Sequence, residues 1–246
     1  MSERSGEESS VKSAFPKVLA AVRAALERRP AVVDHSTSAA TLPATNGARC
    51  AELVSQFADE LERVNGHFMG VMTTRELSQK IEALSREIRP RSVAVGEAIA
   101  LDLAPVVRRF ERAGIELVRC GKCNDDERRA LRERLARCDL AVVEANYAIA
   151  ATGTMVVVAT PGRPSSLTLL PPANVILVDA LRVLPDMAAV VSALGPGTIS
   201  QHRVAFVTGP SRTADIEKMI VLGVHGPKEL YAAVVWPGED EIAGRQ

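Results

Sequence analysis

Residues 106–143 read VVRRFERAGIELVRCGKCNDDERRALRERLARCDLAVV, and they alternate between two apolar periods. Segments 106–112 and 125–137 carry apolar side chains at helical spacing, whereas 115–119 and 140–143 are short apolar runs typical of buried strands. Helices and strands that alternate in this way predict parallel strands joined by right-handed crossovers, with both faces of the sheet covered. We therefore expect an α/β fold.

Further helices and strands of the same kinds lie on both sides of this stretch. Residues 50–64 and 76–88 repeat apolar side chains at helical spacing, and 92–95 is a short apolar strand candidate. Some of the later strand candidates are joined too tightly for a helix, so part of the sheet is expected to be antiparallel. These candidates are 155–159, 166–170, 175–178, 203–207 and 230–236. The sequence predicts a mixed, largely parallel sheet flanked by helices.

The amino-terminal part of the chain differs from the rest. Residues 13–29 have the spacing of one amphipathic helix, whereas 30–47 are rich in Ser, Thr, Ala and Pro without an apolar period. We therefore divide the chain into an amino-terminal helix with a flexible linker at 1–46 and a main domain at 47–246.

The composition excludes several classes of protein. With 246 residues, of which 47% are apolar and 24% charged, the chain can bury a sizeable core and is neither disordered nor collagen-like. The 30 Lys and Arg residues balance the 30 Asp and Glu residues, so no overall basic field favours nucleic acid or an anionic membrane. The apolar stretches are too short to span a membrane, and the polar, acidic start does not resemble a secretory signal. We expect a cytoplasmic protein that binds no nucleic acid.

The cysteines predict neither disulfides nor a metal site. Cys50, Cys120, Cys123 and Cys138 are most simply reduced thiols. Cys120 and Cys123 have the spacing of a redox pair or of half a zinc site, but no second pair and no histidine cluster completes it. We interpret them as ordinary thiols beside the turn that ends a strand.

The turn after 204–207 is the first predicted binding site. This apolar strand runs into a Gly-Pro-Ser-Arg-Thr turn, and the apolar residues that follow have helical spacing. A strand, a tight turn and a helix in succession direct main-chain N–H groups and the positive end of the helix dipole at one point, which favours an anion. The alternative is a well-capped helix with a solvated arginine. The predicted ligands of a small carboxylate or phosphate are Gly209, Ser211, Arg212 and Thr213.

A second site is predicted after the strand that ends at Glu144. The loop that follows carries Thr152, Gly153 and Thr154, where the glycine permits close approach of a ligand and the hydroxyls can donate hydrogen bonds. Arg163 lies on a further loop of the same region. Glu144 is the carboxylate predicted to act as nucleophile or base, the alternative being a surface side chain that ends a strand. The loop lacks the GxGxxG and GxxxxGK[ST] patterns, so we assign no cofactor.

His225 is a candidate acid–base group. It lies in the run Gly-Val-His-Gly-Pro, which predicts a rigid loop before the last strand. A histidine there can transfer a proton or donate a hydrogen bond to a ligand near neutral pH. The alternative is a histidine with a structural hydrogen bond.

Four runs of residues, taken in order, resemble the LUD-domain (lactate utilization) family. They are YAIAATGT at 147–154, SLTLLPP at 166–172, GPSRTADIE at 209–217 and GVHGP at 223–227. The resemblance implies the fold of ribose-5-phosphate isomerases and CoA transferases, and a role in bacterial oxidation of L-lactate to pyruvate. It also implies partner proteins that carry iron–sulfur clusters. The cysteines of this chain lack the CxxCxxC spacing of such a cluster, so we expect it to be the subunit without metal.

The chain departs from the family pattern at two positions. An acidic residue often stands in the family where this chain has Ala151, and a histidine often stands near the position of Asn174. These departures weaken a catalytic role more than a binding role.

Functions of different classes follow from these patterns. The first is a non-metal subunit of a lactate-oxidation system that binds a small anionic ligand or a partner protein around the predicted turns and His225. The alternative is a free-standing transferase- or isomerase-like enzyme acting on a phosphorylated or acyl-CoA substrate, with Glu144 as nucleophile or base. A third hypothesis is an adaptor whose amino-terminal helix docks on the iron–sulfur partner.

Overall fold

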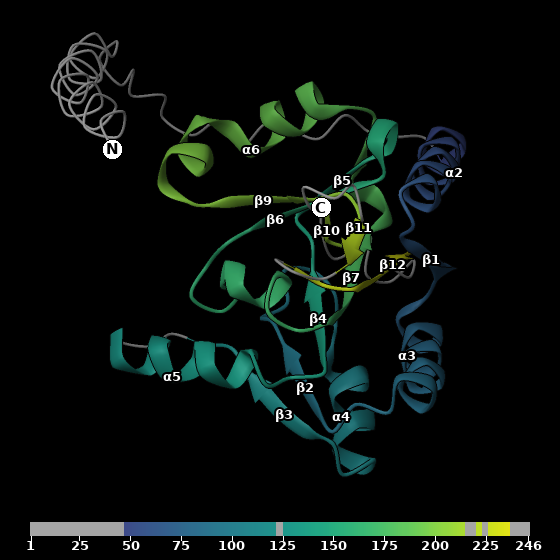
Figure 1. Cartoon of the computed structure of the whole chain (residues 1–246). Helices are drawn as coiled ribbons and strands as arrows, with labels where there is room; N and C mark the ends of the chain where they lie inside the picture. Colours follow the sequence, from purple (N-terminus) through teal and green to yellow (C-terminus); the bar gives the residue numbers. More distant parts are fainter. Residues whose placement is uncertain (1–46, 122–124, 215–219, 223–225, 237–246) are drawn as a thin grey trace, which may run out of the picture. The chain divides into compact units, whose positions relative to one another are not determined.

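Six parallel strands form the central sheet. The computed structural model describes residues 47–121, 125–214, 220–222 and 226–236, which belong to one compact unit. The strand order is β1-β12-β7-β4-β2-β3, and every neighbouring pair is parallel (Figure 1). The strands are β1 (His67–Met72), β2 (Ser92–Val95), β3 (Glu116–Arg119), β4 (Leu140–Glu144), β7 (Ala173–Asp179) and β12 (Glu229–Val235).

Helices cover both faces of this sheet. They are α2 (Gly47–Arg63), α3 (Thr74–Ile88), α4 (Ala104–Arg112) and α5 (Asp125–Leu135). Because successive strand residues point to opposite faces, Val93, Val95 and Val142 pack with α3 and α4, whereas Ala94 and Val143 pack with α2 and α5. Figure 1 accordingly shows β1 and β12 between α2 and α3. Burial on both faces explains why these strands are continuous apolar runs in the sequence.

A capping box determines where α3 begins. The Thr73 hydroxyl accepts a hydrogen bond from the Glu76 N–H at 3.4 Å, and the Glu76 carboxylate accepts one from the Thr73 N–H at 2.8 Å. These hydrogen bonds satisfy N–H groups that a helix start leaves without partners. They also lower the pKa of Glu76. The helix therefore begins two residues before the first position of the predicted segment at 76–88.

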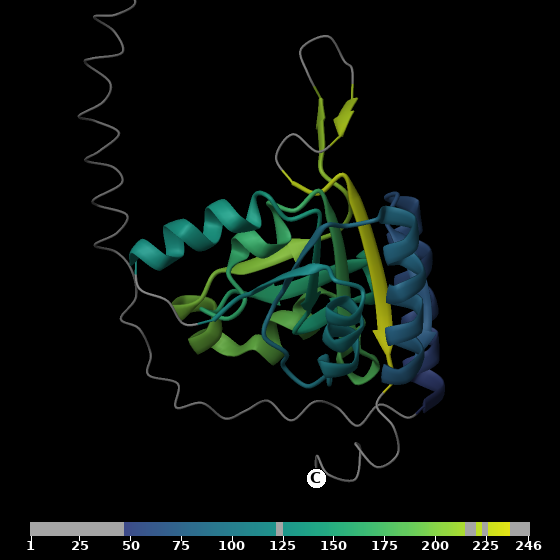
Figure 2. The ribbon, with the colours of Figure 1, turned by 90° about the horizontal axis from the view of Figure 1, so that it is seen from below.

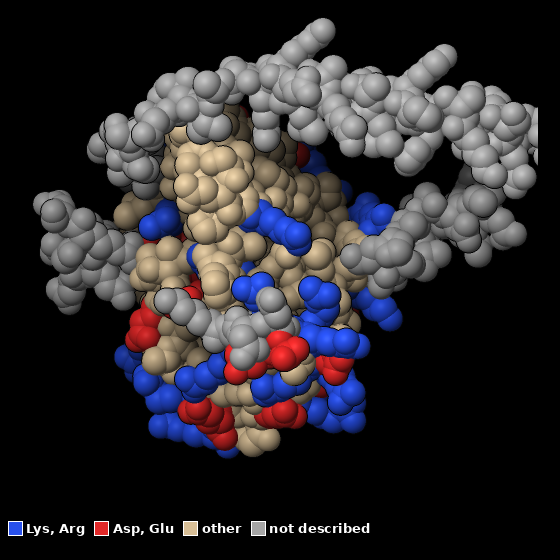
Figure 3. Space-filling view, turned by 90° about the vertical axis from the view of Figure 1, so that its left-hand side faces the viewer, with Lys and Arg blue, Asp and Glu red and all other residues tan. Residues whose placement is uncertain are grey.

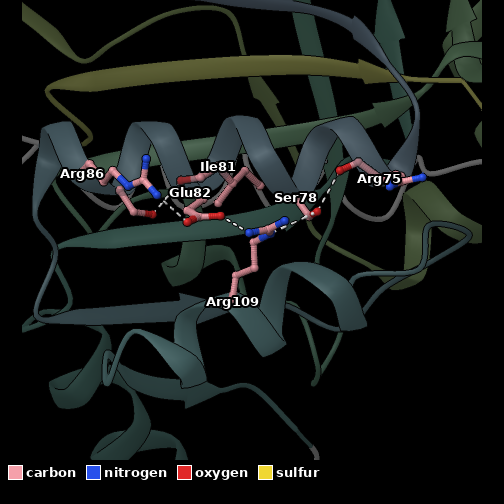
Figure 4. A network of polar contacts seen from close by, with 7 residues as sticks. Arg75, Ser78, Ile81, Glu82, Arg86 and Arg109 are labelled. Atoms are coloured by element: carbon pink, nitrogen blue, oxygen red, sulfur yellow. Dashed lines mark hydrogen bonds and ion pairs between the residues drawn. The ribbon is translucent and has the colours of Figure 1, made fainter.

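Polar contacts join α3 to α4 (Figure 4). Arg109 on α4 donates to the carboxylate of Glu82, and its Nε donates to the Ser78 hydroxyl at 3.3 Å. Arg86 donates to the same Glu82 side chain at 2.7 Å. Such partly exposed ion pairs contribute about 0–1 kcal/mol each. Their effect is mainly to orient α4, whose first turns line the candidate site.

A second sheet is mixed. It has the order β8-β5-β6-β9, with β5 (Tyr147–Ile149), β6 (Thr154–Val158), β8 (Val183–Leu184) and β9 (Val204–Val207). The pairs β5–β6 and β6–β9 are antiparallel, whereas β5–β8 is parallel. One side of it packs on the central core through Met155 and Val157. The other side packs against α6 (Met187–Gln201) through Val156, Val190 and Leu194. The predicted α/β fold with a largely parallel sheet is confirmed, although the antiparallel pairs of the described residues lie outside the central sheet.

Two of the predicted elements are wrong. The predicted strand at 166–170 is a short 3₁₀ helix at Ser165–Thr168, followed by a Pro-Pro pair that cannot donate to a strand ladder. On each side of residues 215–219, which lie outside the described residues, the helix predicted after the Gly-Pro-Ser-Arg-Thr turn gives way to strand. These are two antiparallel strands, β10 (Arg212–Ala214) and β11 (Ile220–Leu222). Figure 2 shows this hairpin extending from the main body. The β-branched residues that it contains favour strand over helix.

Other expectations fall outside the described residues. The predicted amino-terminal helix, Cys123 and His225 all lie there. In the part of the chain that is described, no helix is both long and apolar enough to cross a bilayer.

Candidate functional site

The strand order reverses between β2 and β4. After β2 the chain passes to β3 at one edge of the sheet, whereas β4 is followed in the sheet by β7 on its other side. In open parallel sheets, the crevice outside the carboxyl ends of two such strands is where ligands bind. A ligand site at this switch point would therefore be formed by the residues that follow β2 and β4.

Glu144 closes one side of this crevice. Its side chain is fully buried, and its carboxylate accepts main-chain hydrogen bonds from Ile99 at 2.7 Å, Ala100 at 3.0 Å and Leu101 at 3.1 Å. The loop between β2 and α4 is thus tied to the end of β4. These hydrogen bonds give Glu144 a structural role. Its role as nucleophile or base stays a prediction.

A cavity of about 600 Å³ lies beside this loop, at the carboxyl ends of β2 and β3. We call it the switch-point cavity. Leu101, Leu103 and Val107 supply an apolar wall. Its charged lining residues are Glu97, Asp102, Arg108, Glu111 and Arg119. A cavity of this size, with an apolar wall and charged groups, suits a small-molecule ligand.

The arginines of the cavity differ in their partners. Arg119 donates to the Glu111 carboxylate at 2.8 Å, so its charge is compensated. Arg108 is exposed, and its side chain has no ion pair with any residue in the described ranges. It is therefore the guanidinium of this cavity that remains available to a carboxylate.

Arg163 lies buried between Glu144 and the next strand. Only 7% of this residue is exposed, and its Nη1 donates to the Glu144 carbonyl oxygen and to the Asn146 side-chain oxygen, each at 3.4 Å. Burial lowers the pKa of Arg163, while the carboxylates of Glu144 and Glu97 act in the opposite direction. The structure thus brings together two residues that the sequence selected, Glu144 and Arg163, as parts of one buried network.

The two predicted anion turns meet at the C-terminal end of α2. Gly153 has a φ of +60°, and a Cβ there would lie 2.6 Å from the Cα of Leu61. The Thr154 hydroxyl lies 2.9 Å from that of Thr208 and 2.7 Å from that of Thr152. The main chain of α2 at Leu61 thus lies directly against Gly153.

Arg212 also binds the end of α2. Its Nη2 donates to the Val64 carbonyl at 2.6 Å, and the Ser211 N–H donates to the Pro227 carbonyl at 2.8 Å. A Cβ on Gly209 would lie 3.0 Å from the same Val64 oxygen. The C-terminal end of a helix carries partial negative charge, which favours a cation and opposes an anion. No helix begins at residue 213, so no helix dipole favours an anion at this turn. Anion binding by the turn stays a prediction.

Glu97 and Arg108 were not among the site residues predicted from the sequence. Only their positions in the sequence could have indicated these residues, because Glu97 comes two residues after an apolar strand and Arg108 lies in the helix that follows. Only the neighbouring positions of β2, β3 and β4 in the sheet place both residues at one crevice. Within the described ranges, no group of His, Cys, Asp and Glu side chains is arranged to hold a metal ion.

The fold and the site define an α/β protein with a parallel sheet and a ligand-sized crevice at its topological switch point. A family model described as the LUD domain matches residues 54–235, and the chain belongs to this family. The resemblance found in its sequence motifs is thereby confirmed.

Two curated relatives and one solved structure show how far the similarity extends. Lactate utilization protein C from Halalkalibacterium halodurans is 26% identical over 180 residues, which cover 72% of this chain and 76% of the relative. Lactate utilization protein C from Bacillus pumilus is 30% identical over 182 residues, or 72% and 75% of the two chains. A crystal structure of a DUF162 family protein from Deinococcus radiodurans has a TM-score of 0.55 at 21% identity, covering 77% of this chain and 98% of that one. At this identity, the structural match supports the fold alone.

Proposed function

We propose that this chain is a component of a bacterial L-lactate utilization system, in which lactate is oxidised to pyruvate. The observation that carries the proposal is its membership of the LUD domain family together with relatives named lactate utilization protein C. In this proposal the chain acts in the cytoplasm as a subunit without metal. Its partners are proteins that carry iron–sulfur clusters and perform the electron transfer.

The ligand of this subunit is a small carboxylate in the switch-point cavity. Arg108 offers an uncompensated guanidinium there, and the apolar wall of Leu101, Leu103 and Val107 accommodates the carbon skeleton. A charge-assisted hydrogen bond to a carboxylate is about twice as strong as a neutral one. The anchored loop around Ala100 keeps this site formed before the ligand arrives.

Growth of the source bacterium tests the cellular role. Deletion of the gene is expected to abolish growth on L-lactate as sole carbon source and to leave growth on pyruvate unchanged. The purified chain alone is expected to oxidise no lactate, whereas tagged chain is expected to co-purify with iron–sulfur proteins. Robust lactate oxidation by the isolated chain, or normal growth of the deletion strain on lactate, would contradict the proposal.

Complementation tests the site. Arg108→Gln is expected to reduce growth on lactate because it removes the guanidinium that lines the cavity. Arg112→Gln on the same helix is the matched control, because Arg112 is exposed and is not among the described lining residues. Equal growth of the two strains would remove the ligand role of Arg108 while leaving the pathway assignment intact.

A second candidate function is a transferase- or isomerase-like enzyme with Glu144 as nucleophile or base. The position of Glu144 at the carboxyl end of β4 favours it, since catalytic groups in parallel sheets commonly lie at such ends. A covalent acyl adduct on Glu144 after incubation with acyl-CoA, seen by mass spectrometry, would support this function. Full enzymatic activity of a purified Glu144→Gln variant would exclude this role of Glu144.

A further inference from the structure

A second cavity, of about 300 Å³, lies on the side of the molecule that carries α5. We call it the α5 cavity. Its walls are α5, the loop at 159–166 and the turn between α6 and β9. Pro161 lines both this cavity and the switch-point cavity, so the two adjoin at one loop.

The lining of the α5 cavity is basic. It includes Arg128, Arg132, His202 and Arg203, and none of the described residues that line it is an Asp or a Glu. The side chains of Arg132 and Arg203 form no ion pair with any described residue. Figure 3 shows this side of the molecule, where Lys and Arg side chains are spread over the middle and lower parts and Asp and Glu side chains lie among them in the lower part. The switch-point cavity, by contrast, mixes arginines with carboxylates.

Two of these arginines lie on one helix face. Arg128 and Arg132 are four residues apart on α5, so their side chains lie one above the other. Like charges at this spacing destabilise a helix by about 0.2–0.5 kcal/mol. The neighbouring Arg129 differs, because it lies within 3.7 Å of the Glu133 carboxylate and does not line the cavity. An anion in the cavity would compensate the charge of Arg132, which forms no ion pair with any described residue.

Thr160 supplies a second, independent observation. Its hydroxyl oxygen is buried and has no hydrogen-bond partner, although its own N–H and carbonyl oxygen are both paired with Arg163 at 3.0 Å. Leaving a buried polar group unpaired costs about 1–3 kcal/mol. Thr160 is one of the residues that line the α5 cavity, which makes its unpaired hydroxyl the candidate partner of a ligand oxygen.

The walls of the cavity are held in place by the rest of the fold. The reciprocal hydrogen bonds between Thr160 and Arg163 close the loop, and the Ala159 N–H donates to the Arg203 carbonyl at 2.8 Å. Leu131 of α5 packs on the central core. Such preorganised walls lower the entropic cost of binding a small ligand.

We propose that the α5 cavity binds the phosphate group of a small molecule. Guanidinium groups and hydroxyls match the several oxygens and the double charge of phosphate. The hydroxyl donors of the cavity are Thr160, Ser165 and Ser166. This site is separate from the carboxylate site of the proposed function, and neither depends on the other.

Titration of the full-length protein with inorganic phosphate tests the proposal. Binding is followed by calorimetry and by the shift in Tm at constant ionic strength, with sodium chloride as reference and glycerol 3-phosphate as a probe for phosphate esters. Phosphate is expected to raise Tm where chloride does not. Tighter binding of the ester than of inorganic phosphate assigns the site to an organic phosphate, and equal binding assigns it to the phosphate group alone. A phosphate effect no larger than that of chloride, or tighter binding of L-lactate at the same residues, would overturn the proposal.

Variants locate the site. Arg132→Gln is expected to weaken phosphate binding about five- to tenfold, whereas Arg129→Gln on the same helix changes it less than about twofold. Thr160→Val is expected to weaken binding at least about threefold while Tm without phosphate stays the same or rises, because the unpaired hydroxyl is removed. Equal effects of the two arginine variants, or unchanged binding by Thr160→Val, would contradict the assignment to this cavity.

Discussion

The Glu144 carboxylate accepts a hydrogen bond of 2.7 Å from the main-chain N–H of Ile99, which lies 45 residues earlier in the chain. The carboxylate also receives the N–H groups of Ala100 and Leu101. One buried side chain at the end of β4 therefore anchors the whole loop that follows β2. Because β2 and β4 are neighbours at the topological switch point, this contact shapes the candidate ligand cavity.

Glu144→Gln is expected to loosen this loop. An amide has one accepting oxygen in place of two, and its NH₂ group faces main-chain donors, so at least one buried N–H loses its partner. The expected loss is about 1–3 kcal/mol in the free energy of unfolding, measured by urea denaturation. Hydrogen exchange at residues 99–101 should become faster. Glu97→Gln is the control, since this exposed side chain should change stability by less than about 0.5 kcal/mol, and equal effects would contradict the anchoring role.

Gly153→Ala tests the close packing of the β5–β6 turn on α2. Gly153 and Gly114 both have positive φ, +60° and +69°, but a Cβ on Gly114 meets nothing within 4 Å. Gly114→Ala is therefore expected to cost only the conformational strain, about 1–2 kcal/mol. Gly153→Ala should lose about 1–3 kcal/mol more, because its Cβ would press on the main chain at Leu61. Equal losses in thermal denaturation would show that the helix yields at this contact.

The sequence predicted the elements whose periodicity is strong and local. The segment from β2 to β4 combines short apolar strands with amphipathic helices, and each of its elements was predicted. By contrast, β1 was missed because HFMGVM is a mixed edge strand with a central glycine, and only its pairing with β12 makes it a strand. Helix α6 was missed because its residues are apolar on most sides and Gly195-Pro196 interrupts it.

Less of the candidate site could be predicted from the sequence. Glu144 was selected as a carboxylate at a strand end, but its partners at 99–101 are brought to it by the order of the strands rather than by local spacing. The turn at 209–213 was assigned an anion because the residues after it matched a helical period. The pairing of β10 with β11 took precedence over that period, and Arg212 binds the end of α2 instead.

The buried thiols of Cys50 and Cys138 are expected to resist alkylation. Burial raises the pKa of both thiols, so little reactive thiolate is present near neutral pH. In the native protein both should react with iodoacetamide at least about tenfold more slowly than in concentrated urea, as measured by peptide mass spectrometry. Cys120 is half-buried and lines the switch-point cavity, so it should react in the native state. Rapid native modification of Cys138 would show that α5 opens from the core.

Tyr231 is expected to make stability depend on alkaline pH. Burial, together with the hydrogen bond from its hydroxyl to Glu229 at 2.9 Å, raises the pKa of Tyr231 to about 12. An unfolded tyrosine titrates near a pKa of about 10, so the folded state favours the protonated phenol. This contribution to stability is fully present below about pH 10 and is lost as the pH rises towards about 12. Urea denaturation across this range should show a steeper decline for the wild-type chain than for Tyr231→Phe, and parallel declines would contradict the raised pKa. In Glu229→Gln the phenol should titrate at lower pH in an ultraviolet absorbance titration, because the negative charge that raises the pKa of Tyr231 is removed and the phenol no longer donates a hydrogen bond to a carboxylate.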